Sequence, residues 1–525
     1  MGSARIWQNG RIFTGERWAD ALLVEDGRVV AVGTSEEVRR AAATGADRVD
    51  LSGRLVVPGL IDAHLHLARI TLARESLDVG GATSLPDLVE RIRRWAPEHP
   101  SGTLVAHGWT AGQFGDADPT RVVMDDALPD RPLVIYHSSG HAAATNSAAL
   151  RAAGIEPATP DPRGGRIGRD REGAPNGLVY ESALRLLEPV TGEASEVGTE
   201  PLHRTLEIAA SLGLTTVASM NVGPGESGPL ASLRDAERLP LRVRMYLHRE
   251  WFVAGAASGR APLTDSERLS VVGFKGFTDG AFGPRTAWLS APYADAPETS
   301  GLPLANDAEL AEAVRYATEL EVAPALHAIG DAAVGRSLEI LEPAVGRAGP
   351  PARIEHVSLT PPPILSRLAE VRPALVVQPG FLWSDHWLRE RLGPERARWA
   401  YAFRTLLDRG HLLAGSSDAP YDPIDPWRGL AAAVSRRGPL GRSANPSGAE
   451  ALPPEEALQL YTRNGGRVLG EPDLGRLEVG ARADLVLLES TELSGALAQG
   501  AAGVRETWVE GELVYRSSGI HGSND

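Results

Sequence analysis

The stretch RLVVPGLIDAHLH, residues 54–66, is apolar and rich in β-branched residues until it reaches two histidines. Such a run is typical of a buried strand. Side chains two positions apart on a strand point to the same face, so His64 and His66 can bind one ion together. The stretch therefore predicts both core strand structure and a chemical site at its carboxyl end.

Seven further apolar runs follow, and helix-like segments such as NDAELAEAVRYATEL separate most of them. The runs are GLTTVASM (213–220), LRVRMYL (241–247), VVGFKGFTDG (271–280), EVAPALHAIGD (321–331), ARIEHVSL (352–359), ALVVQPGF (374–381) and HLLAGSSDAP (411–420). Strands that alternate with helices favour a parallel sheet, and eight of them predict an α/β fold with a (β/α)₈ TIM-type barrel over residues 58–469.

The spacing of the runs predicts an insertion and a terminal domain. Residues 67 to about 200 separate the first run from the second, which is too long for a simple loop, and we expect a lid over the barrel mouth. The turn dipeptides Asn9-Gly10 and Asp26-Gly27 indicate hairpins near the start. The segment RETWVEGELVYRSSG near the end has the same hairpin-like pattern. Residues 1–57 and 470–520 are therefore expected to form one small β-sandwich domain.

Composition excludes several classes of function. A formal net charge of −15 disfavours nucleic acid and acidic membranes as partners, because both need a basic surface. A chain without cysteine has no disulfide, thiolate metal ligand or cysteine nucleophile. No signal peptide and no run of about 18 apolar residues is visible, which favours a cytoplasmic protein. Assembly as a homodimer is left open.

Polar side chains stand where the apolar runs end. Six of them are His64, His66, Lys275, His327, His356 and Asp418. The strand ends of a barrel converge on one mouth, where such enzymes carry their chemistry. Imidazole and carboxylate ligands suit zinc, with iron, manganese, cobalt or nickel as alternatives. Taken singly, Asp418 can cap a turn and His327 can be a hydrogen-bonded core histidine, but chance placement explains the whole set poorly.

The motifs VVPGLIDAHLH, FKGFTDGAFGPRTA, LHAIGD, RIEH and GSSDAP, in this order, resemble the amidohydrolase superfamily of metal-dependent hydrolases over essentially the whole chain. The motifs HGWTAGQF and SSGHAAATNSAAL and the DGxxGxxTA loop resemble more narrowly the amidohydrolase-3 group, which includes N-substituted formamide deformylases and YtcJ-like proteins. The resemblance implies that a metal-activated hydroxide cleaves a carbon–nitrogen bond other than a peptide bond in a small molecule.

The resemblance also implies two Zn²⁺ ions bridged by a carboxylated lysine. His64, His66 and Asp418 would hold one ion, His327 and His356 the other, and Lys275 would lie between them. Lys275 is the only lysine in a chain with 53 Lys plus Arg. A neutral amine can add carbon dioxide whereas a guanidinium stays charged, which gives this position a reason to be lysine. The structural alternative is a surface lysine or an ion-pair partner.

Further motif residues are candidates for the chemistry and for substrate contact. Asp418 would carry a proton to the leaving amine. The candidates for substrate contact are Trp109, His141, Asp279, Gly280 and Arg285. Arg285 suits a substrate carboxylate. For three of these residues a structural role is at least as well supported as substrate contact: lid packing for Trp109, a turn for Asp279 and an internal ion pair for Arg285.

Two alternatives stay open. A mononuclear deaminase of the same superfamily generally carries a Glu a few residues after the strand-five histidine, whereas His327 is followed by Ala-Ile-Gly-Asp. A non-enzymatic barrel scaffold would be expected to have lost ligands, and none of the six is missing here.

Overall fold

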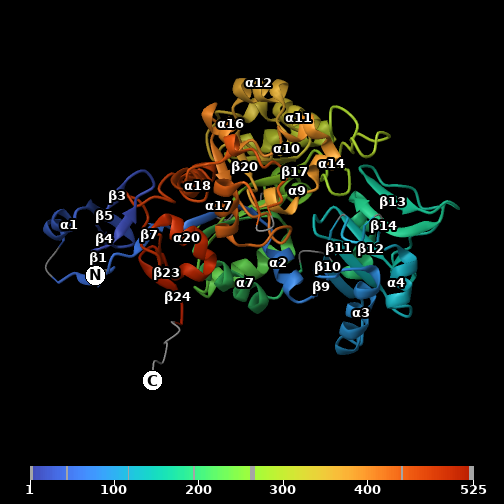
Figure 1. The fold of residues 1–525 in the computed structure, drawn as a ribbon, viewed down its shortest axis with the longest axis horizontal. Helices are drawn as coiled ribbons and strands as arrows, with labels where there is room; N and C mark the ends of the chain where they lie inside the picture. Colours follow the sequence, from blue (N-terminus) through green and yellow to red (C-terminus); the bar gives the residue numbers. More distant parts are fainter. Residues whose placement is uncertain are drawn as a thin grey trace.

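The computed structural model describes residues 4–42, 45–110, 112–115, 117–192, 196–260, 266–304, 306–438 and 441–518. Figure 1 shows a central barrel, a part in which blue N-terminal and red C-terminal strands lie together, and a blue-to-teal part formed by the insertion. Within these residues, no helix combines the length and apolar character needed to cross a membrane. Cytoplasmic location and homodimer assembly stay predictions.

Eight parallel strands form the predicted barrel. They are β8 (Leu60–Leu65), β15 (Leu214–Val222), β16 (Arg242–His248), β17 (Leu269–Phe277), β18 (Ala323–Ala328), β19 (Arg353–His356), β20 (Ala374–Val377) and β21 (Leu413–Gly415). Strands that follow one another in this series are neighbours in the sheet. Backbone hydrogen bonds beyond β21 close the ring, because Asp418 donates its N–H to His64 at 2.8 Å and His66 donates to Ala419 at 2.9 Å. The predicted fold class is confirmed.

Helices connect the strands and cover the outside of the barrel. They are α7 (Thr199–Ser211), α8 (Pro224–Asp235), α9 (Arg249–Ala257), α10 (Asp307–Glu319), α11 (Asp331–Leu341), α12 (Pro362–Val371), α13 (Phe381–Ser384), α14 (Leu388–Leu392), α15 (Pro394–Ala397), α16 (Phe403–Asp408), α17 (Pro426–Ser435), α18 (Pro454–Leu460) and α19 (Arg463–Val468). In α10, Leu310, Ala313, Val314 and Ala317 are buried, at the spacing of one helix face. This is the segment whose pattern predicts a helix.

The apolar stretch 54–66 contributes to two sheets. Its first half, β7 (Leu55–Pro58), belongs to the terminal sheet, and its second half is β8 of the barrel. Gly59 separates them, and a Cβ at this position would lie 2.3 Å from Oγ1 of Thr215. A residue without a side chain is therefore needed where the backbone passes β15. The predicted domain limits 1–57, 58–469 and 470–520 stay predictions.

Strands from both chain ends pair in the terminal domain, as predicted. The two sheets have the orders β5-β4-β1-β6 and β24-β23-β22-β7-β2-β3, and β22 lies antiparallel to β7. The elements are β1 (Arg5–Gln8), β2 (Arg11–Phe13), β3 (Trp18–Ala19), β4 (Ala21–Glu25), β5 (Arg28–Gly33), α1 (Ser35–Ala41), β6 (Asp47–Asp50), β22 (Leu485–Leu488), α20 (Leu493–Gln499), β23 (Val504–Val509) and β24 (Glu512–Arg516). Trp7 of one sheet packs edge-on against Trp508 of the other, with ring centroids 5.4 Å apart.

A buried ion pair joins the barrel to the terminal domain and gives a test of stability. Arg242 at the start of β16 is fully buried and pairs with Asp484 and Glu510. We expect Arg242→Met to lower the free energy of unfolding by about 3–5 kcal/mol, because Asp484 stays buried without its cation. Urea unfolding measures the change. The control Arg505→Gln removes an exposed pair with Glu489 and should cost less than about 1 kcal/mol. Equal stability of Arg242→Met and the parent would contradict the prediction.

The insertion between β8 and α7 has its own sheet, in the order β13-β14-β12-β11-β10-β9. Its elements are α2 (Leu67–Arg74), β9 (Leu77–Asp78), α3 (Leu85–Trp95), β10 (Leu104–Trp109), α4 (Arg121–Ala127), β11 (Leu133–His137), β12 (Ala142–Thr145), α5 (Ser147–Ala152), β13 (Gly165–Arg169), β14 (Pro175–Glu181) and α6 (Glu188–Thr191). Leu88 and Ile92 of α3 pack with Leu104 and Ile135 in a separate apolar cluster. The insertion is therefore a subdomain with a core of its own.

Candidate active site

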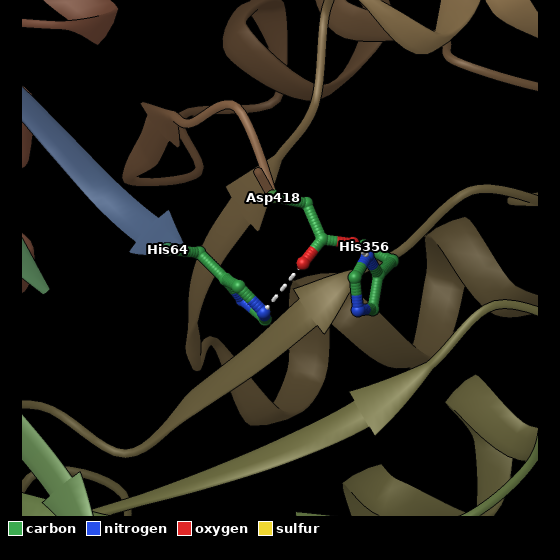
Figure 2. Close-up of side chains that lie close together, drawn as sticks. All are labelled: His64, His356 and Asp418. Atoms are coloured by element: carbon green, nitrogen blue, oxygen red, sulfur yellow. Dashed lines mark ion pairs between the residues drawn. The ribbon is translucent and has the colours of Figure 1, made fainter. Parts of the chain in front are cut away.

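The six predicted ligands lie together at the carboxyl ends of β8, β17, β18, β19 and β21. His64, His66, Lys275, His327, His356 and Asp418 are all buried there. Figure 2 shows the Asp418 carboxylate beside the rings of His64 and His356. One ligand atom from each of these three residues lies within 4.8 Å of the other two. The rings of His327 and His356 have centroids 4.3 Å apart. The structure thus assembles the side chains in one cluster.

The rings of His64 and His66 each point an unprotonated nitrogen at Asp418. Nδ1 of His66 lies 3.1 Å from the carbonyl oxygen of Met220, which only accepts, so we assign the proton to this nitrogen. Nδ1 of His64 lies 2.5 Å from Oε2 of Glu355 and is assigned in the same way. In the neutral rings, both Nε2 lone pairs then point at Oδ1 of Asp418, at distances of 3.1 and 3.2 Å.

A divalent cation would satisfy these three acceptors together. Oδ1 of Asp418 is buried and has no hydrogen-bond donor among the described residues. Three lone pairs facing one another repel, and a divalent ion bound between them turns the repulsion into coordination. Nζ of Lys275 lies 3.3 Å from Nε2 of His64, so the lysine belongs to the same cluster. The donor set therefore fits a metal ion.

The other two histidines have one nitrogen held outside the cluster. Nδ1 of His356 lies 2.7 Å from Oε1 of Gln378. Nε2 of His327 lies 3.0 Å from the carbonyl oxygen of Gly280 and donates to it. Such outer contacts fix the orientation of a metal-binding ring. They leave Nε2 of His356 and Nδ1 of His327 for ligation.

Burial sets the charge of these groups. It lowers the pKa of His66 to about 4 and that of His356 to about 3, so both rings are neutral at neutral pH. It lowers the pKa of Lys275 to about 8, because the ammonium loses its hydration. Neutral imidazoles and an ionised carboxylate are the forms that bind metals.

Sequence reasoning missed the residues that orient the ligands. Glu355 is fully buried, and Arg353 donates to its Oε2 at 3.0 Å and to the hydroxyl of Tyr246 at 2.9 Å. The motif RIEH could have indicated this pair, because Arg353 and Glu355 have opposite charges and stand two positions apart in an otherwise apolar run. Residues at this spacing point to the same face of a strand. Gln378 follows the same rule as the ligands, because it is the polar residue that ends the apolar run ALVVQ.

Glu355 provides a prediction about metal affinity. We expect Glu355→Gln to weaken metal binding by about 10–100-fold, because His64 loses the charged acceptor that orients its ring and raises its basicity. Competition with a chromophoric chelator measures the affinity. The control Glu339→Gln removes an exposed carboxylate that pairs with Arg336 and Arg367, and should leave the affinity unchanged. If both variants bind metal as the parent does, Glu355 does not support His64.

Of the five residues predicted to contact substrate, His141 lies in the wall of a cavity above the cluster. Gly280 stands behind His327 and accepts its hydrogen bond. Asp279 is buried and accepts three backbone N–H groups from the segments that follow β17 and β18. The structure thus gives Asp279 a role in holding the two loops against each other.

Trp109 and Arg285 have their contacts outside the lining of this cavity. Trp109 packs edge-on against His137, with ring centroids 4.9 Å apart. Arg285 pairs with Asp295 at 2.9 Å. Both contacts correspond to the structural interpretations, lid packing and an internal ion pair. Substrate contact by Trp109 and Arg285 stays a prediction.

The cavity has a volume of about 660 Å³, within the usual range for small-molecule sites. Barrel and insertion both contribute to its wall. Besides five of the six cluster residues, the wall includes Asn221, Phe277 and Tyr421 of the barrel together with Arg69, Tyr136, His141 and Glu181 of the insertion. The insertion therefore borders the barrel mouth, and its action as a lid over about 67–200 stays a prediction.

Comparison with known proteins agrees with this geometry. A model of the amidohydrolase family matches residues 47–515. The chain belongs to the amidohydrolase family. The resemblance drawn from the sequence motifs is thereby confirmed.

Individual relatives extend over almost the whole chain. YtcJ of Bacillus subtilis (strain 168), a proposed amidohydrolase, is 33% identical over 98% of this chain and 99% of its own length. The N-substituted formamide deformylase of Arthrobacter pascens is 30% identical over 95% of this chain and 96% of its own. A crystal structure of an uncharacterized metal-dependent hydrolase from Pyrococcus horikoshii is 31% identical, with a TM-score of 0.78 over 96% of this chain and 100% of that one.

Proposed function

We propose that this amidohydrolase cleaves a carbon–nitrogen bond other than a peptide bond in a small-molecule amide, using divalent metal ions held at the barrel mouth. The observation that carries the proposal is the cluster around Asp418, where unprotonated histidine nitrogens face a buried carboxylate oxygen. The two relatives named above support the reaction class, since one is a proposed amidohydrolase and the other an N-substituted formamide deformylase.

The cluster has ligands for two ions, for which we propose Zn²⁺. His64 in β8, His66 directly after it and Asp418 would hold one ion, and His327 and His356 the other. Lys275 is buried beside His64 and would lie between the ions as a carbamate formed with carbon dioxide. This addition needs a neutral amine, and a pKa of about 8 raises the neutral fraction well above that of an exposed lysine.

The chain's own residues would position the substrate and move the proton. Bound metal ions supply a water of lowered pKa and polarise a carbonyl, which is the chemistry that amide hydrolysis requires. Asp418 lines the cavity, so its carboxylate can accept a proton from the attacking water and donate it to the leaving amine. The insertion forms part of the cavity wall and would limit the access of bulk water, which strengthens electrostatic interactions inside.

The alternative of a mononuclear deaminase has less support in the structure. The acidic residue that follows His327 is Asp331 at the start of α11, and its Oδ1 accepts the N–H of Ser290 at 2.9 Å. Asp331 does not line the cavity above the cluster. It is therefore occupied elsewhere and does not offer a proton shuttle to the mouth. The scaffold alternative is opposed by the complete set of candidate ligands.

One assay separates these readings. Metal-depleted protein would be reloaded with zinc in bicarbonate buffer and offered N-substituted formamides, other small amides and aminopurines. Our proposal predicts a primary amine and a carboxylic acid as products, with activity lost to a chelator and restored by zinc. Release of ammonia from an aminopurine without amide cleavage would favour the deaminase. Stoichiometric metal with no turnover of any of these compounds would favour the scaffold.

A further inference from the structure

The insertion carries a histidine–carboxylate pair into the cavity, beside the candidate ligands. Nδ1 of His141 lies 2.7 Å from Oε2 of Glu181. Glu181 is only 6% exposed, and the His141 ring lies 5.3 Å, between centroids, from the ring of His327. Both members of the pair line the same cavity as the cluster. They come from the loop before β12 and from the end of β14, so the insertion's own sheet places them.

Both the backbone conformation of Glu181 and the environment of its carboxylate are energetically unfavourable. Its backbone has φ 55° and ψ −130°, a region that residues with a side chain rarely adopt. Its Oε1 is buried and has no hydrogen-bond donor among the residues that the structure describes. A strained backbone and an unmatched buried oxygen both destabilise a fold, and such features concentrate at functional sites. Packing alone therefore does not account for Glu181.

Gly280 makes room for this carboxylate. A Cβ at position 280 would lie 2.1 Å from Oε1 of Glu181 and 2.2 Å from Oγ1 of Thr286. The carbonyl oxygen of the same glycine accepts the hydrogen bond of His327. The loop after β17 thus contacts both a candidate metal ligand and the carboxylate of the insertion. It fixes the pair close to the place where a substrate must bind.

We propose that His141 is a catalytic residue whose Nε2 hydrogen-bonds the acyl oxygen of the amide, and that Glu181 is the residue that positions its ring. Nδ1 is already bound to Glu181, so Nε2 is the nitrogen left for a substrate, and it forms no hydrogen bond within the described residues. A donor held in place at the acyl oxygen stabilises the charge that develops there during attack. Because Asp418 is assigned to the leaving amine, the oxygen is the atom that lacks a protein partner. The inference rests on the proposed amide hydrolysis.

Kinetics of variants test this contact. We expect His141→Gln to lower kcat on an amide substrate by about 10²–10³-fold with the metal content unchanged. Glu181→Gln should cost less, and the double variant should be no slower than His141→Gln alone, because the two residues act as one unit. The matched control is His107→Gln, another histidine of the insertion, which is hydrogen-bonded to Ser76 away from the cavity lining. It should keep the parent's kcat.

Binding of methylphosphonate tests the inference without turnover, because its tetrahedral oxygens resemble those of an amide carbon under attack. Calorimetry on zinc-loaded protein should show at least about tenfold weaker binding in His141→Gln and unchanged binding in His107→Gln. Equal methylphosphonate affinity in the parent and His141→Gln would overturn the inference. If binding depends on His141 while no amide is cleaved, the contact is supported and the proposed function is the part that fails.

Discussion

Lys275→Ala is expected to hold one metal ion fewer per folded chain than the parent and to lose about 10³-fold or more in kcat. The physical reason is that the carbamate of Lys275 would be the anionic bridge between the two cations, and alanine removes it. Lys275→Arg should perform no better, because a guanidinium does not add carbon dioxide. Short carboxylic acids such as acetate or propionate should partly restore activity to the Ala variant by supplying the missing bridge. Metal analysis of the purified variants and steady-state kinetics measure these outcomes.

A control must separate loss of the bridge from loss of any buried cation. Arg436 is buried like Lys275, donates to the carbonyl oxygens of Tyr401 and Asn445, and does not line the cavity. Arg436→Met is expected to lose stability but to keep the parent's metal count per folded chain. Full activity with two metals in Lys275→Arg would contradict the binuclear account and favour a mononuclear site.

Asp418→Asn should reduce kcat by about 10³-fold or more, since the residue is assigned both to a metal and to proton transfer. The amide has nearly the same shape as the carboxylate, so packing changes little. It cannot neutralise a cation, however, and it does not carry the proton to the leaving amine. Metal content should fall together with kcat. The measurement is kcat at saturating zinc, which separates the proton-transfer defect from weaker metal binding.

Asp422→Asn is the matched control for this variant. Asp422 is also buried, lies four residues further along and pairs with Arg428 at 3.0 Å and with Ser384 at 2.6 Å, outside the cavity lining. We expect Asp422→Asn to keep the metal content of the parent even if it melts at a lower temperature. An Asp418→Asn variant that turns over normally at saturating zinc would remove Asp418 from the mechanism.

The barrel and its ligand cluster could be predicted because the same pattern encodes both. Each apolar run forms a buried strand, and the polar residues of the site stand at or shortly after the carboxyl ends of these strands. In a parallel barrel these ends meet, so His64, His356 and Asp418 come together although about two thirds of the chain separates the first from the last. No side-chain detail is needed for this inference, only the order of strands in the sheet.

The supporting contacts depend on register and loop conformation, which periodicity does not specify. Glu355 reaches His64 because β19 and β8 face each other across the barrel, and neither run shows this alone. Arg285 and Asp295 pair in a loop without repeating pattern, so a motif position could not distinguish an ion pair from a substrate clamp. The role of Glu181 follows from its backbone angles and from the space left by Gly280, both of which are tertiary properties.

The measurement that tests the central claim most directly is anomalous X-ray diffraction at the zinc edge, on crystals of zinc-loaded protein grown with bicarbonate. Our account predicts two peaks at the barrel mouth, one beside His66 and Asp418 and one beside His327 and His356. It also predicts electron density that extends Lys275 by a carboxyl group between them. A single peak with an unmodified Lys275, or no peak among these side chains, would contradict the binuclear metal centre on which the proposed function depends.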